Sequence, residues 1–395
     1  MQRRKIKVLR IINRFNIGGP TYNATFLSKF LSEDFETLLI GGLPEEGESD
    51  SLHIPRSYGL EPLLIPELKR QPNFFSDRKA LKKIKEIIRE FNPDIVHTHA
   101  SKAGAIGRKA AIDCKVPVIV HTFHGHVFHS YFGSFKTYLF KLIERRLAAK
   151  TNGIIAISEL QKKELCEQYR IAPEHKTSVI PLGFDLQKFQ VHQQAKRAKT
   201  RQEFGIQEDE VAIAIIGRLS PVKNHSFFLE VIANLHARTT EKIKVFIVGD
   251  GEERDRIQQK IEVLCPTAPI LFTSWIKDIA SFNPGMDIIC LTSHNEGTPV
   301  SLIEAQACNV AVISTDVGGV RDIVDDGNTG YICPPNNLEN YADKLLKLVE
   351  DEKIRQKMSQ NGWSFVENKF GYQRLVKDVE KYYKNRLREK GYTFE

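Results

Sequence analysis

The sequence predicts an α/β protein made of two doubly wound halves, and three observations point to this fold class. Short apolar, β-branched runs recur along the 395 residues, and several are separated by amphipathic segments of helical length, such as residues 77–91. The runs are continuously apolar rather than alternating, which is typical of strands covered on both faces of a parallel sheet. A polar segment rich in Gln and Lys, residues 187–202, divides the runs into two series. Strands alternating with helices in each series indicate βαβ units.

The runs give the order of the expected strands. Those of the first half are residues 7–12, 37–40, 94–97, 116–121 and 153–157. Those of the second half are residues 211–216, 245–248, 270–272, 287–291, 310–314 and 330–332. We therefore expect an N-terminal domain over residues 1–190 and a C-terminal domain over residues 191–370. A long, strongly charged helix is expected within residues 371–395, and it could pack back on the N-terminal domain.

The composition is that of a soluble globular protein, with 41% hydrophobic and 27% charged residues. No stretch approaches eighteen uninterrupted apolar residues, so a membrane-spanning helix is not expected. The N-terminal segment is basic and then apolar, but Arg10, Asn13 and Arg14 interrupt it. We therefore expect it to be a buried strand rather than a signal peptide, and the protein to be cytoplasmic.

The cysteine spacing and the net charge narrow the classes of partner. Six scattered cysteines without a short ligand spacing predict reduced thiols rather than disulfides or a zinc site. The formal net charge of +8 favours an anionic partner. A nucleotide phosphate, a lipid phosphate, a membrane surface and a nucleic acid all satisfy that charge.

The loops after the expected strands are where ligands bind in open parallel sheets. After the first strand, Gly18 and Gly19 allow the backbone to turn sharply and to approach a ligand closely. Pro20 and Thr21 can open the next helix, whose first N–H groups attract anions. A tight turn without a ligand explains the same residues. A third glycine at dinucleotide spacing is missing, so a nicotinamide cofactor is not supported.

Four histidines crowd the segment after the strand at residues 116–121. A metal site would need acidic or cysteine ligands at a recognisable spacing, and none accompanies them. We expect His124, beside a glycine beyond the strand's carboxyl end, to contact a polar substrate. The other three, which are more simply strand-end or surface histidines, are His121, His126 and His129.

The C-terminal half contains two loops suited to a diphosphate. Arg218 and Lys223 lie on one short loop after the strand at 211–216, where two cations can hold phosphate oxygens. A solvated basic loop would give the same pattern. The turn at 249–255 resembles half of a phosphate-binding fingerprint, but Arg254 stands where the third glycine would be.

A third loop follows the strand at residues 287–291. Glu296 precedes a helix from about Val300, and Glu304 lies just over one turn inside that helix. The N–H groups of the first helical turn would point to the same crevice, ready for phosphate oxygens. The alternative makes Glu304 a partner of the helix dipole and Glu296 a surface acid, which does not explain why this loop accompanies the Arg218–Lys223 loop.

The order of these motifs resembles the family-four retaining glycosyltransferases. The matching segments are GRLSPVK, VGDG, EGTPVSLIE, DVGGVRDIV and GNTGYICPP, within about Val211 to Asn337. The N-terminal half is similar more loosely, through the Gly18–Gly19 loop and the segments DIVHTH and HTFHGH. The resemblance implies the GT-B architecture, in which two Rossmann-like domains face each other across a cleft.

The resemblance also implies roles for individual residues. Arg218 and Lys223 would bind the donor diphosphate, Glu304 the ribose, and Glu296 the hydroxyls of the transferred sugar. Gly19 would bring a backbone N–H near the phosphates, and His124 would touch the sugar. The remaining donor-binding residues implied are Ile276, beside the nucleobase, and Gly297, Thr298, Pro299, Val300 and Ser301, after Glu296.

Departures from the commonest family pattern concern the sugar and the acceptor. Pro20 and Thr21 follow the double glycine where a small residue and an acid are common. Thr298 and Pro299 replace a bulky residue in the donor loop. The diphosphate site matches the pattern.

The implied reaction is the transfer of a sugar from a nucleotide-diphosphate sugar, with UDP favoured, to a glycan or lipid-linked acceptor. Such an enzyme would serve surface polysaccharide or glycoconjugate synthesis. Fixed cations and helix N-terminal dipoles would stabilise the charge on the leaving diphosphate, so no metal cofactor is expected. The resemblance implies that the acceptor attacks the face that the diphosphate leaves, without a covalent intermediate.

A basic amphipathic segment, residues 133–150, leaves two interpretations open. It could rest on an anionic membrane that carries a lipid-linked acceptor, which would make the protein peripheral on the inner face of the plasma membrane. The simpler interpretation is a helix whose apolar side faces the core and whose basic side is solvated.

Three other functions fit parts of the sequence. A sugar-nucleotide epimerase shares the two-domain architecture, but the Glu296–Glu304 element argues against it. A nicotinamide-dependent dehydrogenase is disfavoured by both incomplete glycine fingerprints. A non-enzymatic nucleic-acid-binding protein would explain the charge but not the acids in the central loop, so no nucleic-acid partner is expected.

Overall fold

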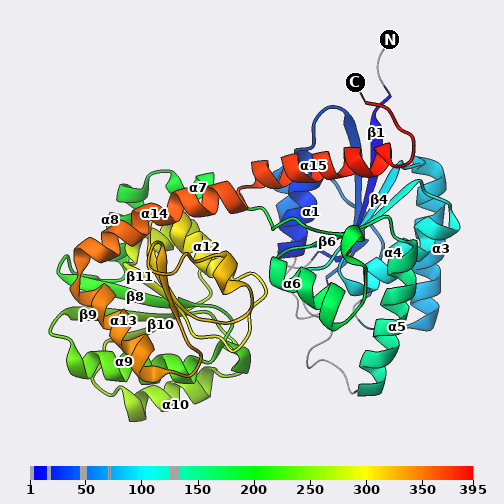
Figure 1. The fold of residues 1–395 in the computed structure, drawn as a ribbon. Helices are drawn as coiled ribbons and strands as arrows, with labels where there is room; N and C mark the ends of the chain where they lie inside the picture. Colours follow the sequence, from blue (N-terminus) through cyan, green and yellow to red (C-terminus); the bar gives the residue numbers. More distant parts are fainter. Residues whose placement is uncertain are drawn as a thin grey trace. The chain divides into compact units, whose positions relative to one another are not determined.

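The computed structural model describes residues 4–15, 19–44, 51–69, 71, 73–124 and 134–394. The chain divides into two compact units, of which unit 1 comprises Met1–Phe184 with Phe370–Glu395, and unit 2 comprises Asp185–Lys369. The first boundary therefore lies earlier than the expected position at residue 190. Figure 1 shows a sheet flanked by helices in each unit.

Unit 1 is built on a seven-stranded parallel sheet in the order β3-β2-β1-β4-β5-β6-β7. Its strands are β1 (Ile6–Arg14), β2 (Phe35–Gly42), β3 (Leu63–Leu64), β4 (Ile95–His99), β5 (Val118–Thr122), β6 (Gly153–Ala156) and β7 (Thr177–Val179). Its helices are α1 (Gly19–Lys29), α2 (His53–Ser57), α3 (Phe74–Phe91), α4 (Ser101–Asp113), α5 (Ser134–Lys150), α6 (Glu159–Lys163) and α15 (Tyr372–Arg388), with short turns η1 (Glu164–Gln168) and η2 (Glu174–Lys176). The sequence did not predict β3 and β7, which are too short to give an apolar run.

Both faces of the unit 1 sheet are covered, as the continuous apolar runs predict. Val8 of β1 packs with Leu27 of α1 and Val379 of α15 on one face. Leu9, the next residue of β1, packs with Ile84 of α3 and buried alanines of α4 on the other face. Successive side chains of a strand point to opposite faces, so a strand covered on both sides must be apolar throughout.

Unit 2 repeats this arrangement with six parallel strands in the order β10-β9-β8-β11-β12-β13. Its strands are β8 (Glu210–Ile216), β9 (Lys242–Val248), β10 (Ile270–Ser274), β11 (Ile288–Leu291), β12 (Ala311–Thr315) and β13 (Gly330–Cys333). Its helices are α7 (Gln187–Gln190), α8 (Gln193–Glu203), α9 (His225–Arg238), α10 (Arg254–Leu264), α11 (Ile279–Phe282), α12 (Val300–Ala307), α13 (Leu338–Glu350) and α14 (Glu352–Phe370, which ends at the boundary), with short turns η3 (Pro221–Lys223), η4 (Asn283–Gly285) and η5 (Gly318–Asp322).

The core of unit 2 also lies on both sides of its sheet. Ile213 of β8 packs with Phe228 of α9 and Leu345 of α13 on one face. On the other face, the ring of Phe246 in β9 meets Phe204 edge-on at 5.6 Å between ring centroids. The predicted fold class is confirmed: both units are α/β domains with parallel, doubly wound sheets.

Helix α5 presents its apolar side outward, contrary to the core-facing interpretation of its sequence. Tyr138, Leu139 and Ile143 are 58%, 50% and 39% exposed. Polar side chains attach the helix: Glu144 pairs with the fully buried Arg108 at 2.6 Å, and Arg145 donates to the carbonyl oxygens of residues 169 and 170. At the end of the helix, the fully buried Ala148 joins a hydrophobic cluster. Within the described part of the chain, no helix has the length and apolar character needed to span a bilayer.

Candidate active site

The loops after β8 and β11 meet at the point where the strand order of unit 2 reverses. These strands are neighbours although two others, β9 and β10, lie between them in the sequence. In open α/β sheets, ligands bind at such a switch point, beyond the carboxyl ends of the strands. The loop that carries Arg218 and Lys223 and the loop that carries Glu296 both begin there.

Hydrogen bonds fasten these two loops together. The backbone N–H of His294 donates to the carbonyl oxygen of Val222 at 2.8 Å. The hydroxyl of Thr292 lies 3.2 Å from the carbonyl oxygens of Lys223 and Asn224. Asn224, in the left-handed conformation, then caps the N-terminus of α9. Lys223 is therefore held at the end of a short turn, facing the second loop.

Lys223 and Glu296 form an ion pair in this structure. Lys223 Nζ lies 2.6 Å from Glu296 Oε1, and the side chains are 23% and 10% exposed. The Ser293 hydroxyl donates to the same oxygen at 2.6 Å. The structure thus joins two residues whose expected roles concern different parts of a donor, the phosphates and the sugar.

Arg218 lies apart from this pair, although it shares the loop with Lys223. Its side chain is 69% exposed, and its guanidinium reaches Glu252 at 3.4 Å. Exposed ion pairs of this kind contribute about 0–1 kcal/mol. The pair can therefore open at little cost, which leaves Arg218 able to meet an anionic ligand.

The segment after Glu296 leads directly into helix α12. Gly297, Thr298 and Pro299 form the loop, and Pro299 stands at the N-cap without a side-chain hydrogen bond to the helix. The first N–H groups of any helix lack an intrahelical partner, and the dipole there favours negative charge. Val300 and Ser301 open α12 at this end. The geometry suits the binding of phosphate oxygens.

The loop after β12 supports the Glu296 loop from behind. The N–H of Gly319 donates to the carbonyl oxygen of Glu296 at 3.1 Å. Gly318 has a φ of +54°, and a Cβ there would lie 1.7 Å from that same oxygen. A Cβ on Gly319 would lie 2.1 Å from the carbonyl oxygen of Gly297. Only glycines permit this approach of two backbones, which explains the double glycine of DVGGVRDIV.

Glu304 lies on the second turn of α12 and is half-buried. Burial raises the pKa of its carboxyl to about 7, and Lys188 of α7 acts weakly in the opposite direction. Near neutral pH this side chain can therefore be a hydrogen-bond donor or a carboxylate. A carboxylate is the form that accepts hydrogen bonds from two adjacent hydroxyl groups.

The loop expected to lie beside a nucleobase follows β10, and the glycine turn follows β9. Ile276 is half-buried, and the neighbouring Trp275 is 58% exposed. In the turn after β9, a Cβ on Gly249 would lie 1.9 Å from the carbonyl oxygen of Gly217. That glycine therefore allows the loops after β8 and β9 to pack closely. This packing explains the glycine of the incomplete dinucleotide-binding motif without a bound dinucleotide.

In unit 1, Gly19 is the first residue of α1, after β1. Gly18 lies outside the described residues. His124 follows β5 and is half-buried, and its Nε2 lies 2.8 Å from His99 Nδ1. Burial lowers the pKa of His124 to about 3, so its ring is neutral near pH 7.

The other histidines of this segment divide into two groups. His121 is fully buried in β5, where its Nδ1 lies 2.8 Å from the hydroxyl of Thr98. His126 and His129 lie outside the described residues. Among the residues that the structure describes, no group of three His, Cys, Asp or Glu side chains is arranged to hold a metal ion.

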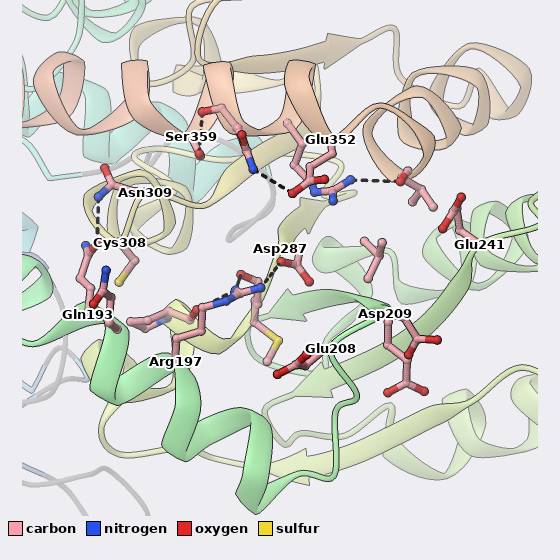
Figure 2. Close-up of a pocket in the computed structure, with 18 of the residues that line it drawn as sticks. Gln193, Arg197, Glu208, Asp209, Glu241, Asp287, Cys308, Asn309, Glu352 and Ser359 are labelled. Carbon is pink, nitrogen blue, oxygen red and sulfur yellow. Dashed lines mark hydrogen bonds and ion pairs between the residues drawn. The ribbon is translucent and has the colours of Figure 1, made fainter.

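Unit 2 has a pocket at the other end of its strands. This pocket of about 670 Å³ lies beside the amino ends of the strands and contains none of the predicted donor residues. Figure 2 shows carboxylates around it, and Arg197 turned toward Asp287, 2.7 Å away. The acids that line it are Glu208, Asp209, Glu210, Glu241, Asp287, Glu350 and Glu352. Such a lining repels a diphosphate, so the charge favours the Lys223 site.

Sequence reasoning missed three contributors. Ser293 holds the Glu296 carboxylate, Gly319 holds the Glu296 backbone, and His99 contacts His124. The expected strand ended at residue 97, whereas β4 extends to His99 and so places His97 and His99 on the same face of the sheet. Ser293 lies three residues before Glu296 in the same loop, so its contact is local. Gly319 reaches Glu296 from the loop after β12, a contact that no local sequence pattern indicates.

Two family models match the chain in succession. Residues 18–188 match the model described as Glycosyltransferase Family 4, and residues 196–364 match the model described as Glycosyl transferases group 1.

Curated relatives and solved structures agree with these matches. The chain is 30% identical, over 80% of its length and 81% of the relative's, to UDP-Gal:alpha-D-GlcNAc-diphosphoundecaprenol alpha-1,3-galactosyltransferase of Escherichia coli. It is 29% identical, over 85% of its length and 88% of the relative's, to the capsular polysaccharide biosynthesis glycosyltransferase CapM of Staphylococcus aureus. The crystal structure of Anabaena Alr3699/HepE in complex with UDP has the same fold, with a TM-score of 0.80 at 18% identity over 96% of this chain and 100% of that one.

Proposed function

Because the chain belongs to the family-four glycosyltransferases, which have the GT-B fold, we propose that it transfers a sugar from a UDP-sugar to a glycan or lipid-linked acceptor with retention of configuration. The observation that carries this proposal is the Lys223–Glu296 pair, 2.6 Å long, at the switch point of unit 2 and beside the N-terminus of α12. A relative that uses UDP-galactose and a structural neighbour that binds UDP support the choice of uridine.

The diphosphate is proposed to bind between Lys223, Arg218 and the first N–H groups of α12. Breaking the bond between the anomeric carbon and the phosphate oxygen places negative charge on the leaving nucleotide. Fixed cations and backbone donors stabilise such charge, and one preorganised donor contributes about 3 kcal/mol. This set of groups is our reason to propose that no metal is needed.

Glu296 is proposed to position the sugar rather than to attack it. Its carboxylate already accepts hydrogen bonds from Lys223 and Ser293. Charge-assisted hydrogen bonds stabilise the carboxylate and make it a weaker nucleophile. The acceptor hydroxyl would then attack the anomeric carbon from the face that the diphosphate leaves, with a phosphate oxygen taking the proton. Glu304 would bind the ribose hydroxyls.

A panel of UDP-, GDP- and ADP-sugars tests the donor proposal. We expect UDP-sugars to raise the melting temperature of the wild type and to be hydrolysed slowly in the presence of EDTA, and Lys223→Ala to lose both effects. Lys242→Ala is the matched control, because Lys242 pairs with Asp209 on the exposed surface. Intact mass in the same incubations should show no glycosyl adduct. The proposal fails if no nucleotide stabilises the wild type, and an adduct on Glu296 would overturn the mechanism.

The exposed stripe of α5 is proposed to rest on an anionic membrane that carries the acceptor. The stripe consists of the exposed Tyr138, Leu139 and Ile143. Further along the same helix lie two exposed cations, Arg146 and Lys150. Apolar side chains next to cations suit the interface of an anionic bilayer. A relative whose named acceptor is a diphosphoundecaprenol lipid supports this placement.

Vesicle co-sedimentation tests the membrane proposal. We expect binding to vesicles containing phosphatidylglycerol and weaker binding to neutral vesicles. The double variant Leu139→Ser/Ile143→Ser should bind several-fold less, because about 25 cal/mol is lost for each Å² of apolar surface no longer buried. Val263→Ser is the control, since Val263 is 78% exposed but lies in α10 of unit 2. Equal binding of the double variant and the wild type would contradict the proposal.

A further inference from the structure

Three histidine rings form a continuous row on one face of the unit 1 sheet. His97 and His99 stand two positions apart in β4, and their ring centroids lie 4.2 Å apart. His124, which follows β5, continues the row with its ring centroid 5.1 Å from that of His99. His97 and His99 are fully buried. The row thus runs from the interior of the sheet toward its carboxyl edge.

The inner end of the row has a fixed tautomer. Arg10 Nη1 lies 2.9 Å from His97 Nδ1. A guanidinium can only donate hydrogen bonds, so His97 Nδ1 must accept and the ring proton must sit on Nε2. That proton points to the hydroxyl of Thr122, 2.7 Å away. Tyr383 of α15 also contacts His97 Nδ1 and Arg10 Nη1.

The outer end of the row has two possible tautomers, which are coupled. His99 Nδ1 and His124 Nε2 lie 2.8 Å apart, so one ring must donate and the other accept. Among the described residues, His99 Nε2 and His124 Nδ1 are buried without a hydrogen-bond partner. If His99 donates, His124 carries its proton on Nδ1; if His99 accepts, His124 Nδ1 is a bare acceptor.

The rings of His99 and His124 are both neutral near pH 7. Burial lowers the pKa of His99 well below 6.5, and the neighbouring His97, His124, Arg10 and His121 lower it further. Burial lowers the pKa of His124 to about 3. His99 therefore affects which ring nitrogen of His124 carries the proton, and it does not change the net charge of the pair.

We propose that His99 is a positioning residue that fixes the orientation of His124 and couples the tautomer of His124 to its own. Through this contact, His99 determines whether His124 Nδ1 meets a ligand hydroxyl as donor or as acceptor. The expected contact of His124 with a hydroxyl of the substrate rests on the proposed function, whereas the coupling of the two rings does not. His99 itself acts only through His124.

Nitrogen-15 NMR of the histidine rings tests the coupling without any substrate. Because the pKa of His124 is about 3, we expect its ring to remain neutral between pH 5.5 and 8.5 in the wild type. We also expect its two ring nitrogens to show the two distinct chemical shifts of a single tautomer. His99→Phe keeps an aromatic ring but removes Nδ1, so the two shifts should move toward a tautomer average. His99→Asn places an amide near the position of Nδ1 and should restore a defined tautomer.

The matched control is Thr98→Val, at the neighbouring position on the opposite face of β4. It removes the hydrogen bond to His121 and should leave the shifts of His124 unchanged. The coupling is overturned if His99→Phe leaves the His124 shifts as in the wild type, or if wild-type His124 titrates near pH 6.5.

Kinetics with the preferred donor test the consequence for catalysis. Small misplacements of a contacting group cost about 100-fold in rate, so we expect kcat of His99→Phe to fall by about 10- to 100-fold with KM for the donor little changed. His99→Asn should recover part of kcat. Unchanged kcat in His99→Phe overturns the positioning role. A wild type that transfers no sugar overturns the proposed function, while the NMR result still decides the coupling.

Discussion

The carboxyl of Glu304 carries the pH dependence of the candidate donor site. Its pKa of about 7, raised by burial from 4.5, means that the folded protein binds more protons than the unfolded chain between these two values. The free energy of unfolding therefore falls as pH rises through this window. A ribose ligand that prefers the carboxylate would bind more tightly as the pH rises through the same window.

Glu304→Gln should stabilise the unliganded protein above pH 7 and weaken its binding of UDP. One unit of pKa shift corresponds to about 1.4 kcal/mol, so the gain at pH 8 reaches roughly 3 kcal/mol and disappears below about pH 4.5. Urea unfolding at pH 4.5 and pH 8 measures the gain, and titration with UDP measures the affinity. A variant equally stabilised at both pH values would show that Glu304 is not the source of the pH dependence.

Residue types predicted the site better than they predicted its contacts. Lys223 and Glu296 were both expected at strand-end loops, and both lie there. Their mutual ion pair was not expected, because it depends on β8 and β11 being neighbours, which is a property of sheet order rather than of local sequence. The loop position of Arg218 was expected, but its turn toward Glu252 was not.

At the scale of elements, the turn η5 acts as a backbone support for the loop that carries Glu296. Gly318 and Gly319 stand against the carbonyl oxygens of Glu296 and Gly297 at distances that leave no room for a Cβ. A change in η5 should therefore alter donor binding without removing any group that would touch the donor.

Gly319→Ala should destabilise the protein and lower its affinity for UDP. The added methyl would lie 2.1 Å from the carbonyl oxygen of Gly297, so the two loops must separate. Overpacking of this kind costs about 1–3 kcal/mol, which corresponds to several degrees in the melting temperature of a unit of this size. Gly297→Ala is the control for stability, because a Cβ there meets nothing within 4 Å. Equal melting temperatures of the two variants would contradict the supporting role.

The elements show where a sequence pattern suffices and where it fails. Strands such as β8 and β11 were predicted because burial on both faces requires an unbroken apolar run. The orientation of α5 was not predictable, because its polar side is held by Arg108 of α4 and by carbonyl oxygens near residue 170. Amphipathicity gives two faces but does not say which one the protein buries.

At the scale of the whole molecule, unit 1 is not continuous along the chain. Its backbone leaves at Phe184 and returns at Phe370, and these residues are joined by an N–H···O bond of 2.7 Å. Helix α15 then packs against the sheet, with Val379 and Leu387 in the same cluster as Val8 of β1. Unit 2 is thus inserted into unit 1.

Leu387→Ala should destabilise unit 1 and leave unit 2 nearly unchanged. Leu387 is fully buried, and removal of such a side chain costs about 2–5 kcal/mol. Hydrogen exchange followed by mass spectrometry should show faster exchange in the strands of unit 1 only. Lys381→Ala, at an exposed position of the same helix, is the control. Equal acceleration in both units would show that they unfold as one.

The insertion of unit 2 has a consequence for the order of events during synthesis. The ribosome releases residues 185–369 before it releases α15, so the inserted unit has its whole sequence available while its host still lacks a helix of its core. Until then, the face of the sheet formed by Val8 and Val118 stays partly uncovered. The nascent chain therefore carries an inserted unit whose whole sequence is available, attached to a host unit that only Phe370–Glu395 can complete.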